Sequence, residues 1–253
     1  MISIVIPSYK DPMLHKTIGS LLDNAEGDIE IIPVLDGYDT ELTNDERVRP
    51  IRLRSNVGMR DAINIGASLA RGKYLMRVDE HCRFGQGYDI ILTDKILYNW
   101  IVTPRRYELD IEKWEVIGEP IDNERMIIGR SVIGKRKGGR KFHAQNWPQG
   151  NRGESIYKKT AMQGSCWIME TMLWRDTIGR LETEGYGDLY QDTTEMLFKI
   201  WRVGGKLMLN TDTWYAHKAR KFNRTHSYPR EKAEASFKYA LDKWEGFYRE
   251  RVA

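Results

Sequence analysis

The stretch Lys73-Tyr-Leu-Met-Arg-Val-Asp-Glu-His-Cys82 has the pattern of a short buried strand that ends in side chains able to bind a metal. Residues two apart in an extended backbone point the same way, so Asp79 and His81 should share one face while Glu80 turns away. Open α/β sheets bind their ligands at the carboxyl ends of the strands. The pairing of a carboxylate with an imidazole there favours a divalent cation, and a buried Asp79–His81 hydrogen bond is the alternative.

The segments around this strand alternate between apolar runs and helical periodicity. In the first half, strands are predicted at 2–7, 30–35, 51–53 and 74–78, and helices at 11–24 and 58–70. This order predicts an α/β fold with a mostly parallel, Rossmann-like central sheet flanked by helices. In the second half we expect a helix at 88–97, strands at 100–103, 165–169 and 206–217, helices at 171–179 and 192–203, and a final amphipathic helix at 230–249. Residues 107–128 are consistent with a strand pair, and 129–153 are predicted to form a long basic loop.

Length and composition limit the class of protein. The 253 residues suffice for one domain over 1–253, which divides into a first half (1–98), a second half (99–229) and the final helix (230–253). No apolar run is long enough to span a bilayer, and the amino terminus lacks a cleavable signal pattern. Two cysteines far apart in the sequence and outside any metal-type spacing argue against a disulfide framework. A cytoplasmic protein without an obligate protein partner is therefore expected.

The metal prediction requires a further ligand, because two side chains cannot complete a coordination shell. Of the five histidines, His217 ends the predicted strand segment Thr213-Trp-Tyr-Ala-His217, which makes it the preferred third ligand. Mixed carboxylate and imidazole ligands together with phosphate oxygens suit Mn²⁺ best and Mg²⁺ second.

Two other strands of the predicted sheet also end in polar positions. Pro7-Ser8-Tyr9 follows the first strand and Asp36-Gly37 follows the second. Either is an ordinary turn by itself, but together with Asp79 they indicate a ligand site at one sheet edge. Arg60, near a helix start, is placed to contact an anion or a base.

The acidic segment before the helix at 192–203 carries a candidate catalytic residue. Asp192 either caps that helix or acts as a general base for a hydroxyl. Trp167 and Trp214 flank the same region and are candidates for stacking on an acceptor, although burial is the ordinary fate of tryptophan.

Positive charge is concentrated in one segment. Residues 130–159 contain nine lysines and arginines against one glutamate, a local net charge of +8 in a chain whose total is +4. The segment is either a solvated loop or a surface for a polyanion such as DNA. Candidate acceptor contacts there are Lys137, Arg140 and Lys141.

Taken together, these motifs resemble a known family. Ser3-Ile-Val-Ile-Pro-Ser-Tyr9, Asp36-Gly37, the spacing from Asn56 to Gly72 and Val78-Asp-Glu-His-Cys82 resemble the GT-A fold glycosyltransferases of family 2. Gln163-Gly-Ser-Cys-Trp-Ile168, the helix from Glu195 to Gly205 and Ala216-His217 are also similar to polypeptide N-acetylgalactosaminyltransferases.

The resemblance implies a set of roles. Pro7, Tyr9 and Asp36 would contact the nucleoside of a UDP-sugar, with Arg60 close by. Asp79, His81 and His217 would hold Mn²⁺ against the diphosphate. Asp192 falls on the second acid of the acidic pair of family 2, which acts as a base in inverting enzymes, whereas Gln191 replaces the first acid.

The basic segment then points to an acceptor. The favoured reading is transfer of a hexose to a 5-hydroxymethylated pyrimidine in DNA, as in phage DNA-modifying glycosyltransferases acting in the host cytoplasm. A cytosolic polysaccharide or glycolipid glycosyltransferase is the alternative, in which the final helix would bind a lipid surface. A non-catalytic sugar-nucleotide-binding protein and a nucleotidyltransferase are the remaining options.

Overall fold

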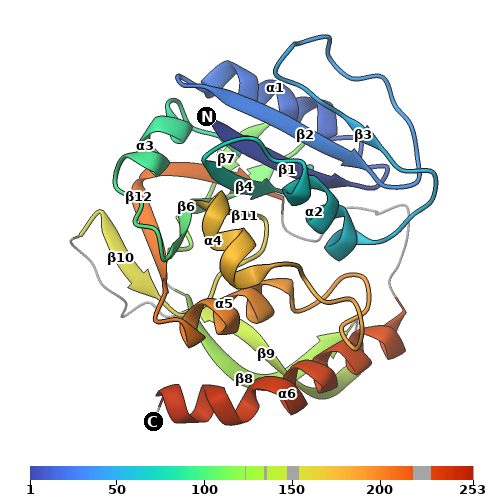
Figure 1. The fold of residues 1–253 in the computed structure, drawn as a ribbon, viewed down its shortest axis with the longest axis vertical. Coiled ribbons are helices and arrows are strands. Elements are labelled where there is room, and N and C mark those ends of the chain that lie inside the picture. Colours follow the sequence, from blue (N-terminus) through green and yellow to red (C-terminus); the bar gives the residue numbers. More distant parts are fainter. Residues whose placement is uncertain (123, 134–135, 147–153, 219–228, 253) are drawn as a thin grey trace.

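The computed structural model describes residues 1–253 apart from 123, 134–135, 147–153, 219–228 and 253. A central mixed sheet carries helices on both faces, and a smaller two-stranded sheet lies beside it (Figure 1). The strands of the large sheet follow the order β10-β12-β6-β11-β4-β1-β2-β3, with β5 paired to β12 and β7 paired to β6. Their bounds are β1 Ile2–Ser8, β2 Ile29–Leu35, β3 Ile51–Arg52, β4 Tyr74–Val78, β5 Cys82–Phe84, β6 Trp100–Asp110, β7 Glu115–Ile117, β10 Ile156–Lys159, β11 Cys166–Glu170 and β12 Lys206–His217.

The first half of the sheet is parallel, as the sequence predicts. β1 lies between β2 and β4 and runs parallel to both, with Ile4 opposite Ile31 on one side and Met76 on the other. All seven residues of β1 are buried, which explains why this strand appears in the sequence as a nearly continuous apolar run. The carboxyl ends of β1, β2 and β4 therefore meet at one edge of the sheet.

The second half mixes strand directions. β11 runs antiparallel to β4, whereas β12 runs parallel to β6 and antiparallel to β5. The pairing of β12 with β5 places His217 opposite Cys82, directly after the motif at the end of β4. Segments that are 135 residues apart in the chain thus come together because one long strand, β12, reaches back to the centre.

Each face of the sheet has its own hydrophobic cluster. Alternation along β1 sends Ile4 and Ile6 to the face covered by α1 (Leu14–Asn24) and α3 (Tyr88–Asp94), and Val5 to the other face. That second face is covered by α2 (Met59–Ser68), α4 (Thr171–Leu173), the π-helical turn Trp174–Ile178 and α5 (Asp192–Arg202). A Cβ on Gly66 of α2 would lie 2.3 Å from Val5 Cγ1, so the small residues of α2 allow it to pack directly on β1.

The basic segment differs from its prediction. In place of a continuous loop over 129–153, residues up to 146 form an antiparallel hairpin of β8 (Glu124–Ile133) and β9 (Arg136–Asn146). The last helix, α6 (Arg230–Val252), lies along this hairpin (Figure 1) and buries Phe237 and Trp244. Glycines and cations interrupt the alternation of apolar and polar residues that identifies a strand in the sequence. The hairpin tolerates this composition because it packs against α6 and is not buried in a core on both faces.

None of the helices in the described part of the chain combines the length and the apolar character that crossing a bilayer requires.

Candidate metal centre and its surroundings

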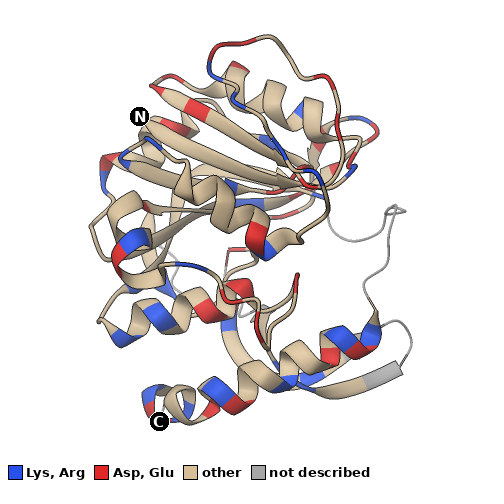
Figure 2. Ribbon diagram, turned by 45° about the vertical axis from the view of Figure 1, so that its right-hand side comes forward, with Lys and Arg blue, Asp and Glu red and all other residues tan. Residues whose placement is uncertain are grey.

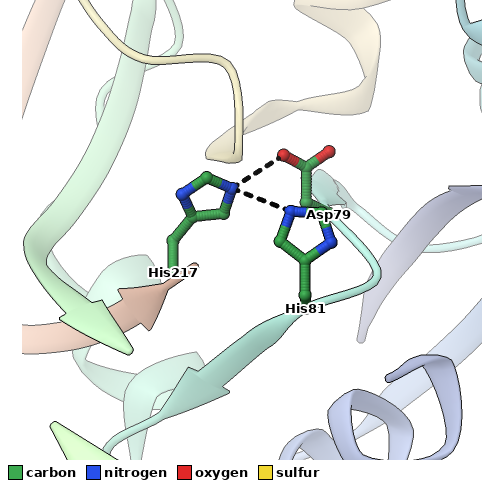
Figure 3. Close-up of side chains that lie close together, drawn as sticks. All are labelled: Asp79, His81 and His217. Carbon is green, nitrogen blue, oxygen red and sulfur yellow. Dashed lines mark hydrogen bonds and ion pairs between the residues drawn. The ribbon is translucent and has the colours of Figure 1, made fainter. Parts of the chain in front are cut away.

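Three predicted ligand residues converge at the carboxyl edge of the sheet (Figure 3). Asp79 Oδ2 lies 3.2 Å from His217 Nε2, and His81 Nε2 lies 3.1 Å from the same nitrogen. His81 and His217 are buried, and Asp79 is partly exposed. The ligand atoms of all three residues lie within 4.8 Å of one another. The structure thus brings together the three side chains that the sequence analysis proposed as ligands.

The donor set fits a divalent cation. Two imidazole nitrogens that face each other at 3.1 Å can share only one hydrogen, and the nearby carboxylate oxygen is also an acceptor. His217 Nδ1 is buried and has no hydrogen-bond partner among the described residues. One carboxylate oxygen and two imidazole nitrogens within 4.8 Å of one another match the preferences of Mn²⁺ and related transition metals.

The charge states of these groups suit the same role. Burial lowers the pKa of His217 to about 4, although Asp79 acts in the opposite direction, so the ring is neutral at neutral pH and retains a lone pair. Burial works against ionisation of Asp79, but Arg77 and the two histidines more than offset it and hold its pKa well below the usual range. Asp79 is therefore a carboxylate at any physiological pH.

Arg77 fixes the orientation of Asp79. Its Nη2 donates to Asp79 Oδ1 over 2.6 Å, while the other carboxylate oxygen faces His217. Arg77 is 2% exposed and is the penultimate residue of β4, on the same face as Asp79. The sequence analysis did not assign a role to this residue, although a charged residue inside an apolar strand was the available signal.

Glu80 turns away from the cluster, as alternation predicts, and meets the end of β1. Its Oε1 accepts a hydrogen bond from the Tyr9 backbone N–H over 2.6 Å. Burial and the nearby Asp11 raise the pKa of Glu80 to about 7. Asp11, Glu80 and His81 form a second group of metal-competent side chains that shares His81 with the first.

The three positions that the resemblance assigns to a nucleoside lie at the same edge. Pro7 is buried within β1, and Tyr9 follows the strand with its ring 6.4 Å from that of Tyr38. Asp36 is 3% exposed and accepts hydrogen bonds from the backbone N–H groups of Val57 and Gly58. Burial raises the pKa of Asp36, which these two bonds counteract. Asp36 thus holds the loop that leads into α2.

Arg60 has a different environment from the predicted one. Its side chain is 0% exposed and forms an ion pair with the buried Glu195 of α5. Two other guanidinium nitrogens donate to backbone carbonyls, with Nε 2.7 Å from Glu182 O and Nη1 3.0 Å from Tyr190 O. The expectation that Arg60 contacts an anion or a nucleotide is wrong for this structure, because all of its donor groups point into the protein.

Asp192 is the first residue of α5 and lies close to Arg77, the residue that donates a hydrogen bond to Asp79. Asp192 Oδ2 and Arg77 Nη1 lie 3.2 Å and 3.9 Å from the point that a Cβ on Gly164 would occupy. Burial raises the pKa of Asp192, whereas the charges of Arg77 and Arg60 lower it. The preceding residue, Gln191, has a φ of 62° and donates from Nε2 to Phe142 O of the hairpin over 3.1 Å.

The predicted acceptor contacts do not form one group. Trp167 is fully buried in the core and stacks on Trp174, with ring centroids 5.7 Å apart, so its assignment as a stacking surface is wrong. Trp214 is partly exposed and packs edge-on against Tyr107, three residues before His217 on β12.

The predicted cations belong to the hairpin. Arg140 pairs with Glu245 of α6 at 2.6 Å, and Lys141 Nζ lies 5.0 Å from the Phe237 ring centroid. Lys137 lies in β9, but its side chain is outside the described part of the structure, as are several other residues of the basic segment.

Comparisons with known proteins agree with this architecture. The model of the glycosyl transferase family 2 matches residues 3–115. The chain is 38% identical over 87 residues to EpsJ, an uncharacterized glycosyltransferase of Bacillus subtilis (strain 168), covering 31% of this chain and 25% of that protein. It is 26% identical over 272 residues to polypeptide N-acetylgalactosaminyltransferase 12 of Mus musculus, covering 98% of this chain and 44% of that protein. The chain thus spans less than half the length of both relatives.

Two solved structures have a similar fold. One is the crystal structure of GalNAc-T7 with UDP, GalNAc and Mn²⁺, with a TM-score of 0.77 and 19% identity over 98% of this chain and 50% of that one. The other is the crystal structure of TarS from S. aureus, with a TM-score of 0.56 and 14% identity over 86% of this chain and 36% of that one. At these identities the likeness establishes a shared GT-A fold.

Proposed function

We propose that this chain, which has the GT-A fold and a glycosyltransferase family 2 region over residues 3–115, transfers a hexose from a UDP-sugar to an acceptor hydroxyl. The observation that carries the proposal is the convergence of Asp79, His81 and His217 at the carboxyl edge of the sheet. A structural relative solved with UDP and Mn²⁺ supports the same cofactor and donor class for this site.

Asp79, His81 and His217 would hold the metal, with Mn²⁺ as the first candidate and Mg²⁺ as the second. When bound, the ion would neutralise charge that builds on the departing diphosphate. Arg77 keeps Asp79 oriented and ionised for this task through its 2.6 Å contact. Pro7, Tyr9 and Asp36 line the neighbouring strand ends, which supports their assignment to the nucleoside.

Asp192 is the proposed general base. It is buried at the start of α5, and Arg77 interacts electrostatically with both Asp192 and Asp79. A carboxylate at that position would accept the proton of the acceptor hydroxyl as the new glycosidic bond forms. Its raised pKa makes it a stronger base than an ordinary aspartate once it is ionised.

For the acceptor we propose a 5-hydroxymethylated pyrimidine in DNA. The basic hairpin supports this choice because it lies next to the proposed base: Phe142 O of the hairpin accepts a hydrogen bond from Gln191, the residue that precedes Asp192. A polyanion bound along β8 and β9 would therefore lie close to the proposed base. On this proposal the protein acts in the cytoplasm, where such DNA is found during phage infection.

The alternative of a glycolipid acceptor receives less support from α6. Phe237 and Trp244, which form the apolar stripe of this helix, are buried against the protein and are not free to enter a lipid surface. A polysaccharide acceptor remains the competing candidate, and a non-catalytic sugar-nucleotide-binding protein is the further one.

A screen of donors against acceptors tests the proposal. UDP-glucose, UDP-galactose and their N-acetyl forms are each incubated with Mn²⁺ and either hydroxymethylated duplex DNA, unmodified DNA of the same sequence, or a set of glycans. Transfer to hydroxymethylated DNA alone supports the full proposal, and transfer to a glycan alone retains the enzyme class but replaces the acceptor. Binding of UDP without transfer or hydrolysis for any pair would favour the non-catalytic alternative.

A further inference from the structure

We propose that Asp11 is a positioning residue, which fixes the ring of His81 so that Nε2 presents its lone pair to the bound cation. The inference relies on the proposed function only for the identity of the cation. The contact that carries it is present in the protein alone: His81 Nδ1 lies 3.0 Å from Asp11 Oδ2, and both side chains are more than nine-tenths buried.

The chemistry of this contact determines the tautomer. An ionised carboxylate can only accept hydrogen bonds, so the hydrogen between Asp11 and His81 belongs to Nδ1 of the ring. The other nitrogen of a neutral imidazole is then unprotonated, and it is Nε2 that faces His217 Nε2 at 3.1 Å. A carboxylate on the outer nitrogen of a metal-binding histidine is a recurrent arrangement that orients the ring and increases its basicity.

Asp11 is itself held in place by the start of α1. Its Oδ1 accepts a hydrogen bond from the Met13 backbone N–H over 2.8 Å, which leaves Oδ2 for His81. The two carboxylate oxygens thus have separate tasks. Asp11 belongs to the connection between β1 and α1, which also carries Tyr9. This connection therefore joins a residue assigned to the nucleoside to the metal cluster.

The backbone of the motif is fixed by a different residue. Thr17 Oγ1 of α1 donates to Glu80 O over 2.7 Å and accepts from Cys82 N over 2.9 Å. These two bonds hold the backbone on both sides of His81. Removal of the Asp11 carboxylate also removes the bond from the Met13 N–H, but it should leave the backbone on both sides of His81 in place and change the orientation and tautomer of that ring.

The experiment measures Mn²⁺ binding, with and without UDP, by isothermal titration calorimetry on the full chain. We compare the wild type with Asp11→Ala, Asp11→Asn and the control Asp23→Ala, which removes an exposed carboxylate from α1. Loss of an outer hydrogen bond of this kind costs about 10- to 100-fold in metal affinity, which is the loss expected for Asp11→Ala. Asp11→Asn, whose amide oxygen can still accept from Nδ1, should retain most of the affinity, and Asp23→Ala should retain all of it.

Two outcomes would overturn the proposal: wild-type affinity in Asp11→Ala, or an equal loss in Asp11→Asn and Asp11→Ala, which would assign the effect to charge alone. If Asp11→Ala does not fold, ¹⁵N NMR of the imidazoles in the wild type decides. The His81 signal, identified by its absence in His81→Asn, should show hydrogen on Nδ1, and hydrogen on Nε2 would refute the inference.

The NMR result separates this inference from the proposed function. A wild-type protein with the Nδ1 tautomer that does not transfer sugar would retain the role of Asp11 and refute the glycosyltransferase proposal. An enzyme that transfers sugar but carries the Nε2 tautomer would give the reverse result.

Discussion

Arg77 carries a positive charge at a strand position that pairs with two apolar core residues, Val5 on β1 and Trp167 on β11. Its guanidinium donates to Asp79, and its charge stabilises the ionised form of Asp192. Arg77 Nε has no hydrogen-bond partner among the described residues. A single buried cation thus interacts with two carboxylates, the one that we assign to the metal and the one that we assign as the base. The ionisation of these two carboxylates should therefore be electrostatically linked.

The pH dependence of transfer should report this link. Burial raises the pKa of Asp192, so the inactive protonated form persists to higher pH than for an ordinary aspartate. As pH rises through that raised pKa, the base ionises and kcat/KM should rise with it, giving an acidic limb. Measurement of kcat/KM against pH with saturating Mn²⁺ tests this, and a limb that persists unchanged in Asp192→Asn would rule out Asp192 as its source.

Substitution of Arg77 should move that limb in a known direction. Without the cation, burial and the Asp79 charge both favour protonation of Asp192, so the limb of Arg77→Met should shift to higher pH. Arg77→Lys retains the charge and should shift the limb less. Identical limbs in the wild type and both variants would show that the two carboxylates are not linked through this residue.

At the scale of elements, the Arg60–Glu195 pair joins α2 to α5 inside the core. Both side chains are 0% exposed, and the Arg60 guanidinium also stacks on Tyr186 at 4.3 Å. The pair secures the start of α5, the helix that carries Asp192. A residue that the sequence suggests as a ligand contact is therefore a structural connection between two helices.

Removal of one member should be costly. Arg60→Met would leave Glu195 buried with Lys199 as its remaining cationic partner among the described residues, and such a loss typically costs about 3 to 5 kcal/mol of unfolding free energy. The matched control is Arg180→Ala, which breaks an exposed pair with Asp61 and should cost less than about 1 kcal/mol. Urea unfolding of both variants checks this, and equal losses would contradict the structural role of the buried pair.

The positive charge of the hairpin is partly offset, because acidic side chains of α6 contact it. Glu245 pairs with Arg140, and Glu234 accepts hydrogen bonds from Gly139 N and Ser131 Oγ. Figure 2 shows basic and acidic residues interspersed along α6. The cations that remain exposed, such as Arg130, are the ones that a polyanion would contact.

If DNA binds here, its affinity should fall steeply with salt, since each neutralised phosphate releases counterions. Arg130→Ala should lower the slope of log affinity against log salt by about one. Lys16→Ala, on α1 at the opposite end of the view in Figure 1, should not change it. Fluorescence anisotropy with a labelled duplex measures both slopes, and an unchanged slope in Arg130→Ala would remove the hairpin from the proposed acceptor surface.

The sequence predicted those elements whose periodicity is set by burial. The apolar runs at 2–7 and 30–35 became β1 and β2, because strands buried in a sheet need continuous apolar residues, and the predicted strand at 206–217, which is apolar on either side of a polar break, became β12. The hairpin β8–β9 was missed since glycines and cations dominate it. The shared face of Asp79 and His81 was predictable from alternation, whereas the environment of Arg60 depends on partners more than 100 residues away and that of Trp167 on the helices that cover its face of the sheet.

At the scale of the whole molecule, the site is built from residues of both halves of the chain. The region that matches the family 2 model supplies β1, β2 and β4, with Asp79 and His81, but His217 comes from β12 and Asp192 from α5. The first half alone would hold two of the three side chains that we assign to the metal. We therefore expect donor binding and metal binding to depend on the second half folding against the first.

The central claim is that the Asp79–His81–His217 cluster binds a metal that the reaction of a UDP-sugar requires. The most direct measurement is the rate of UDP release from UDP-sugars by the wild type and by Asp79→Asn, each with Mn²⁺ and with a chelator, after circular dichroism has confirmed folding. We predict release by the wild type with Mn²⁺ alone, loss of release in the chelator, and little or none in Asp79→Asn. Full release by the wild type in the chelator, or by Asp79→Asn with Mn²⁺, would contradict the account.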